Sequence, residues 1–157
     1  MAEATELLEA SLTIDATPEA VWAVVSDLRR MGEWSPQCRK MFIRGNPVGV
    51  GTRTININRR GALVWPTQST IVRYEKNNTI AWRVAENHTV WSYQITPQGD
   101  GVLLTERREA PGGQTTAVSS ALVNMLMGGR HDFEAELRVG MADSLDKIKR
   151  AAETAAK

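Results

Sequence analysis

Residues 131–155 read HDFEAELRVGMADSLDKIKRAAETA, which is the most regular apolar pattern in the chain. Apolar side chains recur there every three or four positions, so they share one side of an α-helix. Acidic residues come early and basic residues late, which matches the helix dipole. A helix of about 25 residues is roughly 37 Å long, so its apolar stripe needs an equally long surface to pack against. The stripe consists of Phe133, Leu137, Met141, Leu145, Ile148 and Ala152.

The sequence before this helix supplies such a surface in the form of strands. Residues 7–14 alternate apolar and polar side chains, as a half-buried strand does. Six more strands are predicted and are separated by short turns, so the sheet should be antiparallel. Pro66 lacks a backbone N–H and should therefore lie at an edge or a bulge. The six ranges are 39–44, 52–59, 63–74, 80–85, 90–96 and 102–109.

Two short helices are predicted after the first strand. The first begins at Thr17-Pro18-Glu19, because Thr17 can cap free backbone N–H groups and Pro18 suits the first helical position. The second should cover residues 27–34 and be broken at Gly32.

This order of elements predicts an α+β protein with a helix-grip fold. A seven-stranded curved antiparallel sheet should wrap around the long C-terminal helix, with the two short helices following the first strand. A sheet that curves around a helix leaves space between them, and this space is a natural pocket. A further helix is predicted over residues 116–127, and the Gly128-Gly129 pair that ends it is a candidate hinge for opening the pocket.

Length and composition limit the possible classes of protein. The 157 residues suit a single domain over 1–157, and a net charge of +1 argues against nucleic-acid binding. No apolar stretch approaches the roughly 20 residues that span a bilayer, so no integral membrane association is expected. Cys38 is the single cysteine, and the N-terminus has no signal-peptide pattern, so a cytoplasmic protein is expected.

Metal and covalent chemistry find little support in the sequence. His88 and His131 are the only histidines, and neither has a Cys or carboxylate at ligand spacing, so no metal site is expected. Cys38 has no evident base beside it that would make it a nucleophile. The glycine pairs lie at helix ends rather than in a phosphate-binding loop, so no cofactor is expected.

General acid–base chemistry inside the pocket is the remaining catalytic possibility. Strand alternation turns Trp82, Trp91 and Tyr93 inward, and it also turns Glu106 inward on the last strand. A buried glutamate is costly unless it is paired or protonated, and a protonated one could transfer a proton. Tyr93 could orient a ligand or donate a proton. The favoured interpretation of Glu106 is a structural ion pair with one of three arginines, Arg53, Arg73 or Arg108.

Several short motifs occur in the order typical of one superfamily: Thr17-Pro18-Glu19-Ala20-Val21-Trp22, residues 27–34, Trp34-Ser35-Pro36-Gln37-Cys38, Gly51-Thr52, Asn58-Arg59-Arg60-Gly61, Trp65, Trp82, Trp91-Ser92-Tyr93, Gly101 and Thr105-Glu106. With the long last helix, they resemble the START-related, Bet v 1-like (SRPBCC) superfamily, in particular small actinobacterial-type members of its polyketide cyclase/dehydrase and lipid-transport branch. The resemblance covers nearly the whole chain and implies the helix-grip fold. The family usually carries Glu where this chain has Gln37, so an acid–base group is missing there.

The orientation of two features stays open in the sequence. Asn56 and Asn58 alternate with Ile55 and Ile57, and the isoleucines alone would place both asparagines on the outer face. The resemblance implies instead that Asn58 lines the pocket. Trp34 is either a lid over the pocket entrance or a plug that closes the core.

Three functions are consistent with these observations, in the following order. The first is a non-enzymatic carrier or sensor of a small, largely hydrophobic ligand such as a lipid, polyketide or aromatic metabolite. The second is a polyketide cyclase or dehydratase, in which Glu106, Tyr93 and an asparagine would converge. The third is a protein-interaction module with a filled cavity and an exposed apolar patch, although no feature names a protein partner. The candidate ligand-binding residues are Trp34, Asn58, Trp65, Trp82, Trp91, Tyr93, Glu106, Phe133, Leu137 and Met141.

Overall fold

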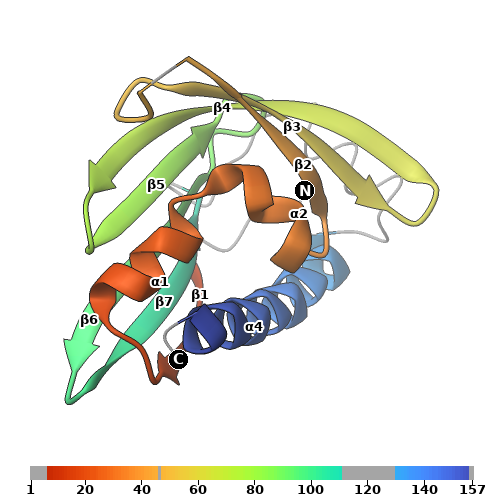
Figure 1. Ribbon diagram of the computed structural model, residues 1–157. Coiled ribbons are helices and arrows are strands. Elements are labelled where there is room, and N and C mark those ends of the chain that lie inside the picture. The colour runs from red at the N-terminus through yellow and green to blue at the C-terminus, as the bar shows by residue number, and fades with distance from the viewer. Residues whose placement is uncertain (1–6, 46, 111–129, 156–157) are drawn as a thin grey trace.

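A seven-stranded antiparallel sheet curves around one long helix, α4 (Arg130–Ala155), as Figure 1 shows. The strands lie in the order β1-β7-β6-β5-β4-β3-β2. This computed structural model describes residues 7–45, 47–110 and 130–155, with side chains throughout except at 130–133. The predicted α+β helix-grip fold is confirmed.

The elements follow one another in the predicted order, and each predicted strand is present with ends within two residues of those expected. The helix predicted over 116–127 and the Gly128-Gly129 hinge lie outside the described residues. The elements before α4 are β1 (Leu7–Ile14), α1 (Pro18–Val25), the 3-10 turn η1 (Leu28–Arg30), α2 (Met31–Trp34), β2 (Cys38–Arg44), β3 (Arg53–Arg60), β4 (Leu63–Glu75), β5 (Thr79–Val84), β6 (Val90–Gln98) and β7 (Gly101–Glu109).

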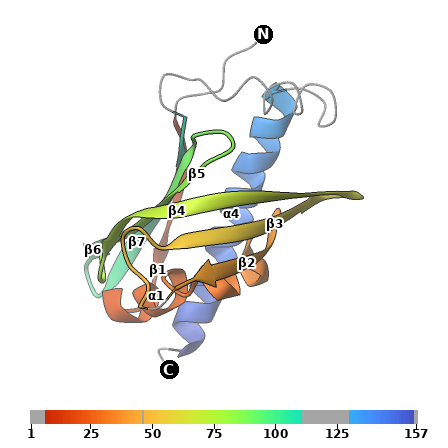
Figure 2. The same cartoon turned by 90° about the horizontal axis from the view of Figure 1, so that it is seen from above.

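The sheet is a meander from β2 to β7, and β1 joins it beside β7. The β3–β4 hairpin extends beyond the rest of the sheet, as Figure 2 shows. Within β4, Pro66 pairs with Ile57 of β3, whereas the pairing with β5 begins only at Ser69. Pro66 therefore lies at a local edge, where a missing N–H costs no ladder hydrogen bond.

Helix α1 begins at the cap that the sequence predicts. The backbone N–H of Ala20 donates to Oγ1 of Thr17 at 3.2 Å, and Pro18 lies in the first turn. The buried side of α1 includes Trp22, whose ring meets Tyr74 edge-on with 5.2 Å between centroids. This contact joins α1 to the concave face of the sheet.

Gly32 does not break the second helical segment, so that part of the prediction is wrong. The segment divides earlier, into η1 and α2, and Gly32 lies inside α2. A side chain at Gly32 would overlap the backbone oxygen of Arg39 on β2. The glycine is therefore needed for the close approach of α2 to β2 rather than for ending a helix.

A Gly32→Ala variant is expected to lower the free energy of unfolding by about 1–3 kcal/mol, because its methyl group must push α2 away from β2. Urea unfolding would measure the change. Gly49→Ala is the matched control, since the position that its methyl group would take has no neighbouring atom within 4 Å, and its effect should stay below about 1 kcal/mol. Equal unfolding midpoints for the two variants would contradict the close-approach argument.

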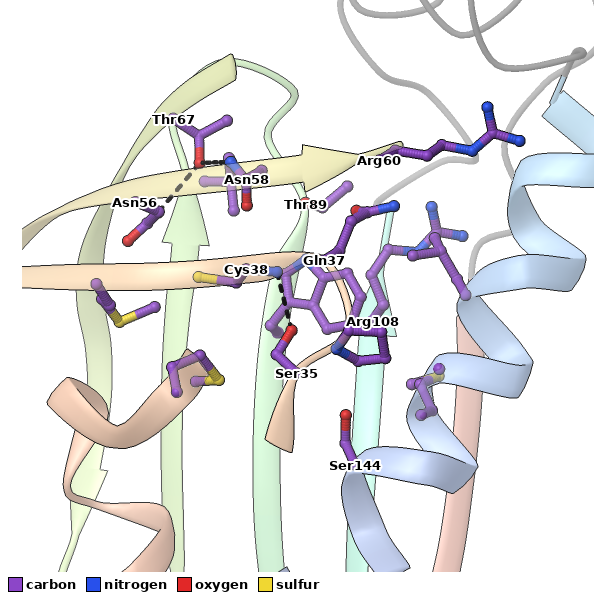
Figure 3. Close-up of a pocket in the computed structure, with 18 of the residues that line it drawn as sticks. Ser35, Gln37, Cys38, Asn56, Asn58, Arg60, Thr67, Thr89, Arg108 and Ser144 are labelled. Carbon is purple, nitrogen blue, oxygen red and sulfur yellow. Dashed lines mark hydrogen bonds between the residues drawn. The ribbon is translucent and has the colours of Figure 1, made fainter. Parts of the chain in front are cut away.

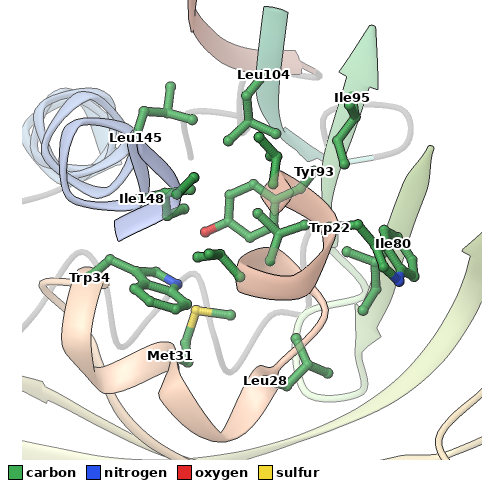
Figure 4. Packing of buried hydrophobic residues seen from close by; sticks show 14 of the residues in the cluster. Trp22, Leu28, Met31, Trp34, Ile80, Tyr93, Ile95, Leu104, Leu145 and Ile148 are labelled. Carbon is green, nitrogen blue, oxygen red and sulfur yellow. The ribbon is translucent and has the colours of Figure 1, made fainter. Parts of the chain in front are cut away.

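The apolar stripe of α4 packs against two different environments along its length. Toward the C-terminal end, Leu145 and Ile148 are buried in the core (Figure 4), and Ala152 is buried in the same cluster. Toward the other end, Leu137 and Met141 line a cavity. No helix in the described ranges is both long and apolar enough to cross a membrane.

Charge is distributed unevenly along the chain. Residues 35–74 contain seven basic side chains and no acidic one, and all seven lie on β2, β3 or β4. Because the whole chain has 19 basic and 18 acidic residues, the rest holds 12 basic and 18 acidic, a net charge of −6. We call this positive part the β2–β4 wing. Its basic residues are Arg39, Lys40, Arg44, Arg53, Arg59, Arg60 and Arg73.

Candidate ligand-binding site

A cavity of about 380 Å³ lies between the concave face of the sheet and the first half of α4. The segment from α2 to β2 forms a third wall (Figure 3). Arg59 and Gly61 also line the cavity and are exposed, so they lie at its rim. The volume falls within the range of small-molecule sites, roughly 300–1,000 Å³.

Much of the cavity wall is apolar and aromatic. Trp82 and Trp91 are register partners on β5 and β6, and Trp65 reaches the same cavity from β4. Met31 and Met141 approach from the helices. Flat rings and unbranched methionine side chains can adapt to a flat apolar molecule. Eight of the predicted ligand-binding residues line the cavity: Asn58, Trp65, Trp82, Trp91, Tyr93, Glu106, Leu137 and Met141.

The other two predicted residues do not contribute described side chains to the cavity wall. Trp34 is 2% exposed and belongs to the hydrophobic core, which agrees with the plug interpretation rather than the lid. The guanidinium of Arg30 lies 5.1 Å from the centre of the Trp34 ring. The backbone oxygen of Trp34 accepts a hydrogen bond from the hydroxyl of Ser144 at 3.0 Å. The side chain of Phe133 lies outside the described residues.

Asn56 and Asn58 of β3 face the cavity, and the alternating Ile55 and Ile57 are half-buried on the outer face of the sheet. Asn56 donates to Ser69 at 2.8 Å and accepts from Thr54 at 2.8 Å. Asn58 donates to Thr67 at 3.0 Å. These bonds satisfy most of the polar groups along one wall, so the wall holds fixed polar atoms without a net charge.

Glu106 and Tyr93 are register partners on β7 and β6, and both side chains are buried in the cavity wall. Burial raises the pKa of Glu106 to about 8, so its carboxyl group is mostly protonated at neutral pH. Burial raises the pKa of Tyr93 well above its ordinary value, and the nearby Glu106 and Cys38 add to the shift. Both groups are therefore neutral hydrogen-bonding groups at pH 7.

The ion pair predicted for Glu106 is absent from the described part of the chain. Arg108 binds Glu134 at 3.1 Å, Arg73 binds Glu75 on its own strand, and Arg53 is exposed. The Oε1 atom of Glu106 is buried and has no hydrogen-bond partner among the described residues. The carboxyl group is thus accommodated by protonation rather than by pairing.

A buried ion pair that the sequence did not predict holds β7 to α4. The side chains of Arg108 and Glu134 are only 3% and 10% exposed. Arg108 lies two residues after Glu106 and lines the same cavity. Strand alternation alone could have placed Arg108 on the inner face, but its partner on α4 could be found only once the helix was positioned.

A second ion pair crosses the rim of the cavity. Arg60 at the end of β3 donates to Glu136 of α4 through two nitrogens, with 2.8 Å between Nε and Oε2. The two side chains are 32% and 47% exposed. The pair therefore links the β3–β4 hairpin to the helix above the entrance, at the position where Figure 3 shows Arg60 directed toward α4.

The loop before β2 brings Gln37 to the cavity, and the first residue of β2 brings Cys38. The backbone N–H of Cys38 donates to Oγ of Ser35 at 3.0 Å. Burial raises the pKa of the Cys38 thiol to about 11, so thiolate is scarce at neutral pH. This agrees with the expectation that Cys38 is no nucleophile.

Two pairs of polar side chains in the cavity wall lie apart from each other. Glu106 and Tyr93 lie on one wall, Asn56 and Asn58 lie on another, and no hydrogen bond joins the two pairs in the described residues. No group of three metal-ligating side chains occurs in residues 7–45, 47–110 and 134–155.

Fold and cavity together define a helix-grip protein with a ligand-sized space under its long helix. Residues 6–153 match the family described as polyketide cyclase / dehydrase and lipid transport, so the chain belongs to that family. A comparison with curated protein sequences found no significant match.

Solved structures share the fold. The Zhui aromatase/cyclase from Streptomyces sp. R1128 aligns with a TM-score of 0.75 at 17% identity, over 96% of this chain and 95% of that one. The Polyketide_cyc-like protein Cgl2372 from Corynebacterium glutamicum is 27% identical, with a TM-score of 0.62 over 95% and 92% of the two chains. The di-domain aromatase/cyclase StfQ of steffimycin biosynthesis aligns at 0.70 and 13% identity over 96% of this chain, which spans 50% of StfQ.

Proposed function

We propose that this protein binds a small, largely hydrophobic molecule of the lipid, polyketide or aromatic class and acts as its carrier or sensor. The cavity of about 380 Å³, with three tryptophans in its wall, is the observation that carries the proposal. Apolar side chains around a cavity lack packing contacts that an apolar ligand would supply. The single cysteine suits a cytoplasmic setting, where we place the protein.

Binding of 2-acetylnaphthalene, a flat apolar ketone, tests the proposal through quenching of tryptophan fluorescence. We expect saturable binding, and a Val84→Phe variant should weaken it about tenfold or more because the added ring occupies the cavity. Val64→Phe makes the same change at a position on β4 that is 57% exposed and should bind like the unchanged protein. Circular dichroism would verify that both variants fold.

Equal affinities for the two phenylalanine variants would overturn the cavity as the binding site. Native mass spectrometry of the purified protein, followed by organic extraction, would identify a molecule already bound. A bound molecule of low polarity and fixed stoichiometry is the expected result.

A cyclase or dehydratase is the second candidate, and the protonated carboxyl of Glu106 in the cavity favours it. A general acid could assist loss of water from a β-hydroxyketone. The compound 3-hydroxy-1-tetralone tests this, because loss of water and tautomerisation give fluorescent 1-naphthol. If the unchanged protein accelerates the formation of 1-naphthol and the Glu106→Gln variant does not, the result would favour an enzyme over a carrier.

The third hypothesis, an interaction module with a filled cavity, receives less support. It requires the space between sheet and helix to be occupied by the protein's own side chains, whereas the described residues leave about 380 Å³.

A further inference from the structure

The carboxyl group of Glu106 is a polar group of the cavity wall with one unsatisfied oxygen. Glu106 is 5% exposed and lines the cavity, and its Oε1 atom has no hydrogen-bond partner in the part of the chain that the structure describes. A buried polar atom without a partner costs roughly 1–3 kcal/mol, and a suitably placed ligand atom can remove that cost. Glu106 therefore indicates where a polar atom of the ligand would lie.

The groups around Glu106 limit the charge of that atom. Tyr93 faces it from β6 with a protonated hydroxyl, and Arg108 follows it on β7 but binds Glu134 of α4. Cys38 of β2 lies near Tyr93 and is a neutral thiol. From β1 the register partner of Glu106 is Ala10, and the α4 residues that line the cavity beyond Glu136 are Leu137, Gly140, Met141 and Ser144.

A charged ligand group fits these surroundings poorly. An ammonium group would need Glu106 to ionise in a buried site and would lie on the same strand face as the guanidinium of Arg108. A carboxylate would need a cation, and the guanidinium of Arg108 is already bound to Glu134. A neutral oxygen acceptor needs neither change.

We infer that the ligand carries a neutral oxygen acceptor, such as a ketone or ester carbonyl, which accepts a hydrogen bond from the carboxyl group of Glu106. This rests on the proposed function, because it names the chemistry of the molecule held in the same cavity. The apolar body of the ligand lies against Trp82 and Trp91, and its oxygen reaches the wall formed by β6 and β7.

A matched pair of probes isolates this hydrogen bond. The ketone 2-acetylnaphthalene and the hydrocarbon 2-ethylnaphthalene have nearly the same shape and differ in one oxygen. At pH 6.5 the unchanged protein should bind the ketone about tenfold more tightly, as one buried hydrogen bond implies. At pH 9.5 that preference should disappear, because the ionised carboxyl of Glu106 has no proton to donate.

Three variants complete the experiment. Glu106→Gln keeps an N–H donor, so it should retain the preference for the ketone at both pH values. Glu106→Leu removes the donor and should lose the preference at both. Glu109→Gln makes the same chemical change at an exposed position of β7 and should behave like the unchanged protein.

Different results would contradict the role of Glu106 and the use of the cavity as a ligand site. A ketone preference that persists in Glu106→Leu, or tighter binding of 2-naphthylmethylammonium than of the ketone, would overturn the role of Glu106. Failure of both the ketone and the hydrocarbon to bind at either pH would instead count against the cavity as a ligand site.

Discussion

A Glu106→Gln variant is expected to be more stable than the unchanged protein at pH 8, by several kcal/mol and at most about 5 kcal/mol. Burial raises the pKa of the Glu106 carboxyl from 4.5 to about 8. The folded protein keeps this proton up to about pH 8, whereas the unfolded chain releases it near pH 4.5. Between these pH values deprotonation favours the unfolded chain, so the glutamate lowers stability increasingly as pH rises. A glutamine amide cannot ionise and is free of this cost.

Urea unfolding at several pH values between 4.5 and 8 would measure the effect. The difference in unfolding free energy between variant and unchanged protein should be small at pH 4.5 and largest near pH 8. Glu109→Gln, at an exposed position of the same strand, should show little change over this range. A constant difference for Glu106→Gln would mean that the carboxyl titrates alike in both states, which contradicts its burial as a neutral acid.

Replacing Arg108 by methionine is expected to lower the free energy of unfolding by about 3–5 kcal/mol. The guanidinium lies 3.1 Å from the carboxylate of Glu134, and both side chains are almost completely buried. Removing the cation leaves a buried carboxylate without the charge that compensates its desolvation. Because this pair joins β7 to α4, the loss also weakens the contact that holds the helix over the cavity.

Arg107→Met is a matched control for that experiment. Arg107 lies on the opposite face of β7 and pairs at 2.7 Å with Glu9, in side chains that are 35% and 48% exposed. An exposed pair contributes little, so this variant should lose less than about 1 kcal/mol. A double variant, Arg108→Met with Glu134→Leu, should be more stable than Arg108→Met alone, since no charge remains buried. Equal losses for Arg107→Met and Arg108→Met would refute the importance of burial.

The elements of the fold could be predicted because their signals are local. The apolar residues of α4 recur with the helical period over six positions, and the strands alternate between short turns. Thr17 and Pro18 mark the start of α1 in the same way. The helix break predicted at Gly32 was wrong because a glycine can either end a helix or allow a close approach of two backbones. Only the position of Arg39 on β2 shows which of the two applies.

The site was harder to predict because it depends on what lies opposite each strand. Alternation placed Glu106 on the inner face, but it gives no distance to an arginine, so the expected ion pair was wrong. On β3, the inner face lines a cavity instead of a packed core. Asn56 and Asn58 can therefore point inward while Ile55 and Ile57 stay half-buried on the outer face. This is the reverse of the usual arrangement, in which the apolar side chains of a strand face inward.

The β2–β4 wing makes this nearly neutral molecule an electric dipole. Its seven basic residues lie together on three neighbouring strands, whereas the rest of the sequence carries a net charge of −6. At physiological salt, fields decay over roughly 8–10 Å, so an approaching surface senses the nearer pole and not the sum of both. A negatively charged surface would therefore approach the protein on the side of the β2–β4 wing. Arg59 and Arg60 belong to the β2–β4 wing and also lie at the rim of the cavity. An approach from this side would therefore bring the cavity entrance close to the negatively charged surface.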